Sequence, residues 1–118
     1  ILKRKRFIIH EGMNKIIYNI RKFNEERDRE QFHDANNLAL SLSIEAAELN
    51  EAFLWKKAEE ADIEKIKEEL ADVFLNALML ADKYHLDVEE ICLAKIAMNE
   101  AKYPIEKSKG NANKYNEL

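Results

Sequence analysis

Two pairs of acidic residues have the spacing that places both members on one side of a helix. Glu45 and Glu48 lie three residues apart in "SIEAAELNEAFLW", and Glu69 and Asp72 repeat that spacing in "KEELADVFLNALML". If the two helices face each other, four carboxylates converge. Like charges within ~4–6 Å raise each other's pKa and destabilise the fold unless something neutralises them. The spacing therefore raises the question of a bound cation.

A hard divalent cation would resolve this repulsion. Mg²⁺ prefers oxygen ligands, keeps several waters and commonly shares its coordination with substrate phosphates. We expect Mg²⁺, with Mn²⁺ as a substitute. Spacing alone leaves a second interpretation open, because Glu-rich helices often produce Glu-x-x-Glu on a solvated face.

Helical geometry places both pairs at the edge of a buried face. At about 100° per residue, one band of the second helix, about 80° wide, holds the first pair and its neighbours. Its members are Asn37, Ser41, Glu45, Glu48, Ala52 and Trp55. A band of the next helix, about 60° wide, holds Lys65, Glu69, Asp72 and Asn76. Apolar stripes containing Leu38, Leu42, Leu49, Ile66 and Val73 flank the two bands.

Composition limits the classes of protein that fit. The chain has 118 residues, 47% hydrophobic and 36% charged, which suits one domain with a modest core. Two glycines and one proline argue against an all-β fold with many tight turns. The formal charge of −4 argues against a general nucleic-acid coat. The single cysteine suits a reducing cytoplasm, and no apolar run reaches the ~20 residues of a membrane span.

The pattern predicts four helices and an all-α four-helix bundle. The first runs from about Met13 to Glu30, and the second follows a cap at Asp34 or Asn36 and reaches about Lys57. Asp62 caps a third that ends near Tyr84 and His85, and Asp87 with Glu90 opens a fourth that Pro104 stops. We divide the chain into a basic arm (1–12, with "KRKR"), a helical domain (13–104) and a polar C-terminal tail (105–118), expected to be mobile unless it orders against something.

The ordered motifs resemble a known family. They are "ERDREQFHDANNLALSLSIEAAELNEAFLW", "EELADV", "KIAMNEAKYP" and "NKYNEL", over roughly residues 24–118. Together they resemble the MazG-like superfamily of all-α nucleoside triphosphate pyrophosphohydrolases, closest to its small dCTP pyrophosphatase branch. Three positions depart from the branch: Arg29 stands where an aromatic is usual, Asn76 where a tyrosine can occur, and Asn36 in place of a basic residue.

The resemblance implies a set of site residues. Glu45, Glu48, Glu69 and Asp72 would bind Mg²⁺, and Lys95, Asn99 and Tyr103 would lie at the phosphate and sugar side. His33, Asn37 and Trp55 would lie nearer the nucleoside, with Asn76 close to the base. The residues themselves add support in places: Lys95 and Asn99 share one band of the fourth helix, and Trp55 could stack on a base. Taken without the family, Lys95 reads as a surface lysine and Trp55 as a core or interface residue.

The expected function is Mg²⁺-dependent cleavage of a (deoxy)nucleoside triphosphate, dCTP or another dNTP, to monophosphate and pyrophosphate. Glu45 or Glu48 would be the general base, and the role would be sanitation of the nucleotide pool. The alternative is a non-enzymatic helical interaction module without metal dependence. A carboxylate-bridged di-iron bundle fits poorly, since it needs Glu-x-x-His pairs on two helices and the chain does not offer two.

A small core and the family resemblance also suggest self-association. We expect a homotetramer, or failing that a homodimer, with helices packed across subunits. A cytoplasmic location without nucleic-acid or membrane partners completes these expectations.

Overall fold

The structure, a computed structural model, describes residues 12–118 and is all-helical over that range. Four helices are long: α2 (Gly12–Glu26), α3 (Ala35–Glu51), α4 (Ile63–Lys83) and α5 (Val88–Lys102). Shorter elements are η1 (Glu30–Phe32), η2 (Ala58–Glu60), α6 (Ile105–Ser108) and η3 (Tyr115–Glu117). The all-α prediction is confirmed. The predicted basic arm lies outside the described residues, apart from Gly12.

Aspartate side chains start three of the long helices where the sequence predicted. Asp34 accepts a hydrogen bond from the Asn37 N–H at 2.7 Å at the start of α3. Asp62 accepts from Glu64 N–H, and Asp87 accepts from Glu90 N–H, both at 3.0 Å. Each bond satisfies a backbone donor that has no partner within the helix. The helix starts could therefore be read from short-range chemistry alone.

Two helix ends differ from the prediction. The first helix ends at Glu26 rather than Glu30, because Asp28 takes a left-handed conformation with φ 50°. The Arg29 N–H then bonds back to the Asn24 carbonyl at 2.9 Å, which closes the helix end. The second helix ends at Glu51 rather than Lys57, and the chain turns through Trp55 with φ 61°. Neither left-handed residue is a glycine, so the usual stop signal is missing from the sequence.

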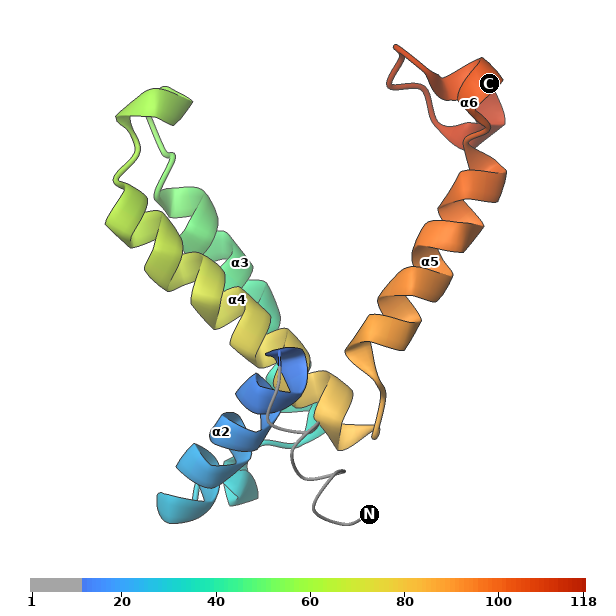
Figure 1. Cartoon of the computed structure of the whole chain (residues 1–118). Coiled ribbons are helices and arrows are strands. Elements are labelled where there is room, and N and C mark those ends of the chain that lie inside the picture. Colours follow the sequence, from blue (N-terminus) through green and yellow to red (C-terminus); the bar gives the residue numbers. More distant parts are fainter. Residues whose placement is uncertain (1–11) are drawn as a thin grey trace. The chain divides into compact units, whose positions relative to one another are not determined.

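The α3 and α4 helices lie side by side as an antiparallel pair, and α2 packs against α4 (Figure 1). Within residues 12–118, the hydrophobic side chains that are buried are Leu38, Ala52, Leu78 and Ala81. Leu38 and Ala52 lie at the two ends of α3, and Leu78 and Ala81 lie in the second half of α4.

The chain divides into two compact units, the first ending at Leu86 and the second spanning Asp87–Leu118. In the second unit, α5 stops at Pro104 as expected, and the chain beyond it contains α6 and η3. The Tyr115 ring packs edge-on against Tyr103, 6.4 Å between centroids, and Lys102 Nζ lies 5.0 Å from the Tyr115 ring. The polar tail thus has short helical turns and orders against the end of α5.

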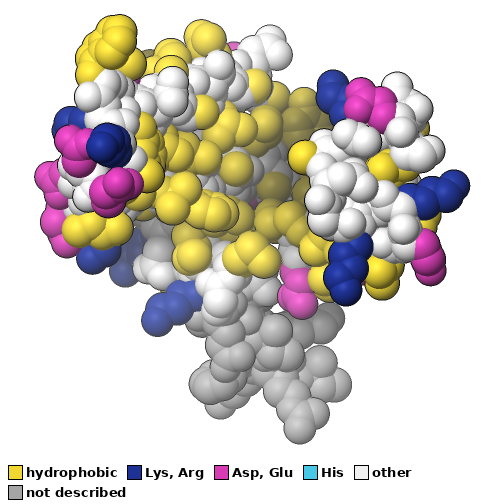
Figure 2. Space-filling view, turned by 90° about the horizontal axis from the view of Figure 1, so that it is seen from above, with side chains coloured by type: hydrophobic (Ala, Val, Ile, Leu, Met, Phe, Trp, Pro, Cys, Tyr) yellow, Lys and Arg dark blue, Asp and Glu magenta, His cyan; other side chains and the backbone are white. Residues whose placement is uncertain are grey.

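Large hydrophobic side chains remain exposed on both units. Leu40, Ile44 and Phe74 are exposed on the α3–α4 pair, and Leu93, Ile96 and Met98 on α5. Figure 2 shows hydrophobic side chains, in yellow, over much of the face in view. None of the described helices combines the length and the apolar character that crossing a membrane requires.

Candidate functional site

Three carboxylates from two helices meet at the edge of the α3–α4 pair. Glu45, Glu48 and Glu69 each offer one oxygen, and these oxygens all lie within 4.8 Å of one another. The first two come from one face of α3, and Glu69 comes from α4, where only 7% of it is exposed. The i,i+3 spacing and the side-by-side packing thus bring the predicted acids together. Asp72, one turn further along α4, lies close enough to act electrostatically on Glu45.

The charges in this cluster are only partly compensated by the protein. Lys65 Nζ pairs with Glu69 Oε1 at 2.9 Å along α4. The second oxygen of Glu69 and Oε2 of Glu45 are buried and have no hydrogen-bond partner. Partial burial raises the pKa of Glu45, and the neighbouring Glu48 carboxylate and the charges of Asp72 and Glu69 raise it further. A buried carboxylate oxygen without a donor needs a cation or a proton.

This donor set fits a hard divalent cation. It offers only carboxylate oxygens, two of them buried and unsatisfied, and no sulfur or imidazole ligand. Mg²⁺ and Mn²⁺ prefer such ligands, whereas zinc sites in proteins usually include cysteine or histidine. The residues present therefore suit the predicted metal, and Glu45, Glu48 and Glu69 would be its nearest protein ligands.

A groove of about 630 Å³ opens beside the carboxylates. We call it the α2 groove, because α2 forms one of its walls. The opposite wall comes from α3 and α4 and includes Glu45 and Asp72, so the groove reaches the acidic cluster. Its lining residues are Lys15, Ile16, Asn19, Ile20, Phe23, Asn24, Arg29, His33, Ser41, Glu45, Asp72, Leu75, Asn76 and Met79.

Two of the predicted nucleoside residues line the α2 groove. His33 follows η1, and the pKa of its ring is lowered mainly by partial burial, with smaller effects of Arg29 and Lys83. Asn76 is buried on α4, and its Nδ2 donates to the Asp72 carbonyl at 2.8 Å. Asn37 does not line the groove; its side chain donates to the Phe32 carbonyl at 3.3 Å and so braces the loop that carries His33.

The structure places Trp55 differently from the helical-wheel prediction. Because α3 ends at Glu51, Trp55 is not on the helical band of Glu45 and Glu48. It lies in the following turn with 93% of its surface exposed, and it does not line the α2 groove. The predicted position of Trp55 on the band of Glu45 and Glu48 was therefore wrong. A contact of Trp55 with the nucleoside stays a prediction.

Lys95, Asn99 and Tyr103 belong to the second unit. The first two are exposed on α5, one turn apart. Tyr103 ends the helix, and its N–H donates to the Asn99 carbonyl at 2.8 Å. Lys95 and Asn99 share one face of α5, as predicted. The position of all three residues relative to the acidic cluster stays a prediction.

Sequence reasoning missed the contribution of α2. Lys15, Asn19 and Asn24 line the groove, yet none was a candidate. The signal was present in part, since the predicted apolar stripe of this helix includes Ile16, Ile20 and Phe23, which also line the groove. We interpreted that stripe as core only. Exposure of Phe23 and Ile16 shows that α2 instead presents part of this face to a cavity.

The chain matches a known protein family over most of its length. The family model described as the MazG-like family matches residues 40–118, a range that contains all four predicted metal ligands. The chain belongs to the MazG-like family. Because the match begins at residue 40, α2 and the loop carrying His33 precede it.

Individual relatives of this MazG-like protein belong to the dCTP pyrophosphatase branch. It is 37% identical to dCTP pyrophosphatase 1 of Mus musculus and 35% identical to that of Homo sapiens. Each alignment covers 82% of the chain and 62% of the relative, so the chain spans less than two thirds of their length. A crystal structure of a pyrophosphatase from Archaeoglobus fulgidus superposes with a TM-score of 0.72 at 34% identity, covering 80% of this chain and 94% of the other. The resemblance to the dCTP pyrophosphatase branch is confirmed.

Proposed function

We propose that this MazG-like protein is a Mg²⁺-dependent nucleoside triphosphate pyrophosphohydrolase. The observation that carries the proposal is the cluster of Glu45, Glu48 and Glu69, with two buried carboxylate oxygens that no protein group satisfies. The names of the relatives support a deoxynucleoside triphosphate as substrate, with dCTP as the first candidate. The products would be a monophosphate and pyrophosphate, in keeping with sanitation of the nucleotide pool.

The acidic side chains would divide the work. Glu45, Glu48, Glu69 and Asp72 would hold the cation, which when bound draws electron density from the α-phosphate and neutralises charge on the leaving group. Water then attacks the α-phosphorus, and the bond from that phosphorus to the bridging oxygen breaks as pyrophosphate leaves. Glu45 and Glu48 are the candidates to accept the proton of the attacking water.

The nucleoside would occupy the α2 groove. Its volume of about 630 Å³ is in the range of small-molecule sites, roughly 300–1,000 Å³. His33 and Asn76 would then lie along the base and sugar, with Arg29 where the branch usually has an aromatic residue. Lys95, Asn99 and Tyr103 would approach the phosphates from the second unit, and Asn37 and Trp55 would complete the nucleoside side in the assembled protein.

Assembly is part of the proposal, because residues 12–118 bury very few large side chains. Leu93, Ile96 and Met98 on α5 are each more than half exposed, as is Phe74 on α4. Exposed apolar surface of this extent is typical of interaction sites. We propose a homotetramer, or a homodimer, in which these faces cover one another. A stable monomer at micromolar concentration, measured by light scattering, would contradict both.

The test is a panel of ribo- and deoxynucleoside triphosphates with Mg²⁺, assayed separately for pyrophosphate and orthophosphate. We expect pyrophosphate from at least one deoxynucleotide, and none when a chelator is added. Release of orthophosphate, or full activity in the presence of the chelator, would contradict the proposed mechanism. Absence of any turnover together with metal-independent binding to another protein would favour the interaction-module alternative.

A further inference from the structure

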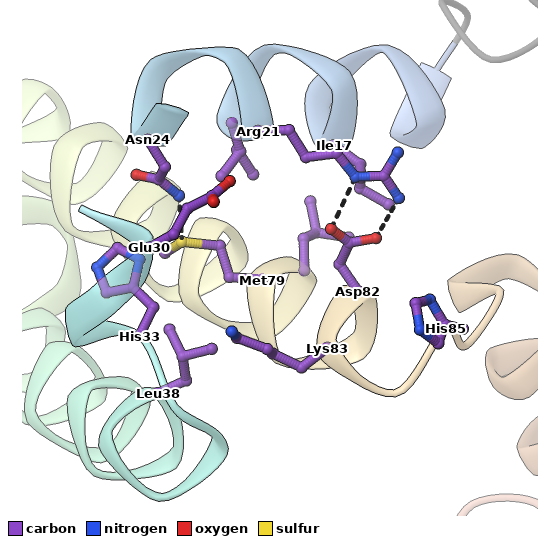
Figure 3. A pocket seen from close by; sticks show the side chains of 12 residues that line it. Ile17, Arg21, Asn24, Glu30, His33, Leu38, Met79, Asp82, Lys83 and His85 are labelled. Carbon is purple, nitrogen blue, oxygen red and sulfur yellow. Dashed lines mark hydrogen bonds and ion pairs between the residues drawn. The ribbon is translucent and has the colours of Figure 1, made fainter. Parts of the chain in front are cut away.

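An ion pair joins α2 to α4 further along α4 than the acidic cluster. Arg21 Nε donates to Asp82 Oδ2 at 2.8 Å, and Arg21 Nη2 donates to Asp82 Oδ1 in a second, parallel bond (Figure 3). The two residues are 61 positions apart in the sequence. Within the described part of the chain, the other two ion pairs both join residues of α4 itself. This pair is therefore the one that ties two helices together there.

The pair lies beside the α2 groove and not in it. Arg21 and Asp82 line a separate pocket of about 260 Å³, shown in Figure 3. Four residues line both cavities and separate them: Ile20, Asn24, His33 and Met79. On α4, Met79 and Asp82 are three residues apart and so are neighbours on the helix surface. The ion pair is thus anchored one turn beyond the groove wall, on the same stretch of helix.

Among the described residues, few other polar contacts join α2 to α4. Asn24 is the buried residue of α2, and its Nδ2 reaches only the Met79 sulfur, at 3.5 Å, which is a weak acceptor. Ile17 and Ile20 are partly buried, while Ile16 and Phe23 are exposed. A bidentate arginine–carboxylate bond is among the stronger polar contacts and also fixes geometry. The position of α2 should therefore depend on this pair more than usual for a surface ion pair.

We infer that the Arg21–Asp82 ion pair is a latch that holds α2 over its groove and thereby sets the affinity for nucleotide. Both residues act as positioning residues, since neither lines the groove. The inference rests on the proposed function for what the groove binds. It differs from that function in assigning part of the affinity to a contact outside the site, carried by a helix that precedes the family-matched segment.

Three variants test the latch. Arg21→Gln and Asp82→Asn each remove the pair, and the double variant Arg21→Asp with Asp82→Arg reverses it. For dCTP with Mg²⁺, we expect KM to rise about two- to fivefold in each single variant, with kcat within twofold of wild type. The reversed pair should recover at least half of the loss on a logarithmic scale. Lys67→Gln is the matched control, because it removes the exposed Lys67–Glu64 pair within α4 and should leave KM unchanged.

A second measurement needs no turnover. Amide hydrogen exchange of residues 12–26 should become faster in both single variants and return towards wild type in the reversed pair. Exchange in α3 and α4 should stay unchanged. An unchanged KM and unchanged exchange in the single variants would overturn the latch. So would a reversed pair that behaves no better than the single variants, or a loss of protection spread over all three helices.

The two proposals fail differently. If wild type converts no nucleotide, the proposed function falls, and exchange in α2 still decides whether the pair holds the helix. Calorimetric titration with a non-hydrolysable dCTP analogue and Mg²⁺ then decides whether the held helix matters for binding. Equal affinity of wild type and Asp82→Asn in that titration would overturn the link to nucleotide.

Discussion

Two carboxylate environments, at Glu69 and at Asp82, lie about three and a half turns apart on α4 and are neutralised in opposite ways. Asp82 is paired by Arg21, which holds the pKa of Asp82 below its usual range. At the other end, Glu69 faces Glu45 and Glu48, and burial together with these like charges raises the pKa of Glu45. Asp82 has its counter-charge within the chain. The carboxylates of Glu45, Glu48 and Glu69 lack a full counter-charge and need a bound cation. That difference separates a structural contact from a binding site.

The largest expected effect comes from removing a ligand of the incomplete group. Glu48→Gln or Glu69→Gln should lower pyrophosphate release by at least about 100-fold, because loss of a metal ligand removes charge stabilisation from the reaction. Steady-state assays with excess Mg²⁺ measure this. Glu68→Gln is the control, since Glu68 neighbours Glu69 but is exposed and outside the cluster. Equal loss in Glu68→Gln would mean that the assay reports overall charge.

Metal binding should also stabilise the fold. A ligand that binds only the folded state adds roughly 2.7 kcal/mol at a concentration 100 times its Kd. We expect Mg²⁺ or Mn²⁺ to raise Tm in wild type and to have little effect in Glu69→Gln. Ca²⁺-free buffers and a chelator baseline define the zero point. If Glu69→Gln gains as much Tm from Mg²⁺ as wild type does, the cation binds elsewhere.

The stability of the metal-free protein should depend on pH through the raised pKa of Glu45. A raised pKa means that the folded state holds the Glu45 proton more tightly than the unfolded state. Its contribution is present below the ordinary pKa of 4.5 and is lost as pH rises through the folded-state pKa. Relative to Glu45→Gln, wild type in a chelator should lose stability over that rise. Denaturant unfolding at a series of pH values measures the difference. If the stabilities of wild type and Glu45→Gln change in parallel with pH, the pKa of Glu45 is not raised in the folded state.

Asp82 should show the reverse dependence, with a smaller size. Its lowered pKa means that the contribution is present above the ordinary value of 3.8 and is lost as pH falls through the lower folded-state pKa. Compared with Asp82→Asn, wild type should be more stable at neutral pH by about 1 kcal/mol or less, because the pair is partly exposed. The advantage should vanish in acid. An advantage that persists in acid would assign it to packing of Asp82 and not to its charge.

How far the sequence predicted these environments depends on the range of the signal. The caps at Asp34, Asp62 and Asp87 and the meeting of Glu45, Glu48 and Glu69 follow from helical spacing and local hydrogen bonds. These interactions span a few residues or one helix pair, so a periodic pattern is enough to find them. The fold class was predictable for the same reason.

The misses have longer range or lack a compositional signal. Trp55 and Asp28 adopt left-handed conformations that favour glycine, so nothing in the sequence marked the ends of α3 and α2. The Arg21–Asp82 pair joins residues 61 apart, and one arginine and one aspartate among many charged residues carry no pattern. The groove wall formed by α2 was hidden because an apolar stripe looks the same whether it faces a core or a cavity.

The turn that carries Trp55 has an optical consequence. It is the only tryptophan of the chain, and in the isolated subunit 93% of its surface is exposed. Its emission from a lone subunit should therefore resemble that of indole in water, and it should be readily quenched by iodide or acrylamide. Covering by a neighbouring subunit or stacking on a base would shift the emission to shorter wavelength and slow the quenching. The emission spectrum of Trp55 would then change with protein concentration when subunits assemble and with added nucleotide when substrate binds. The two events can therefore be separated without a label.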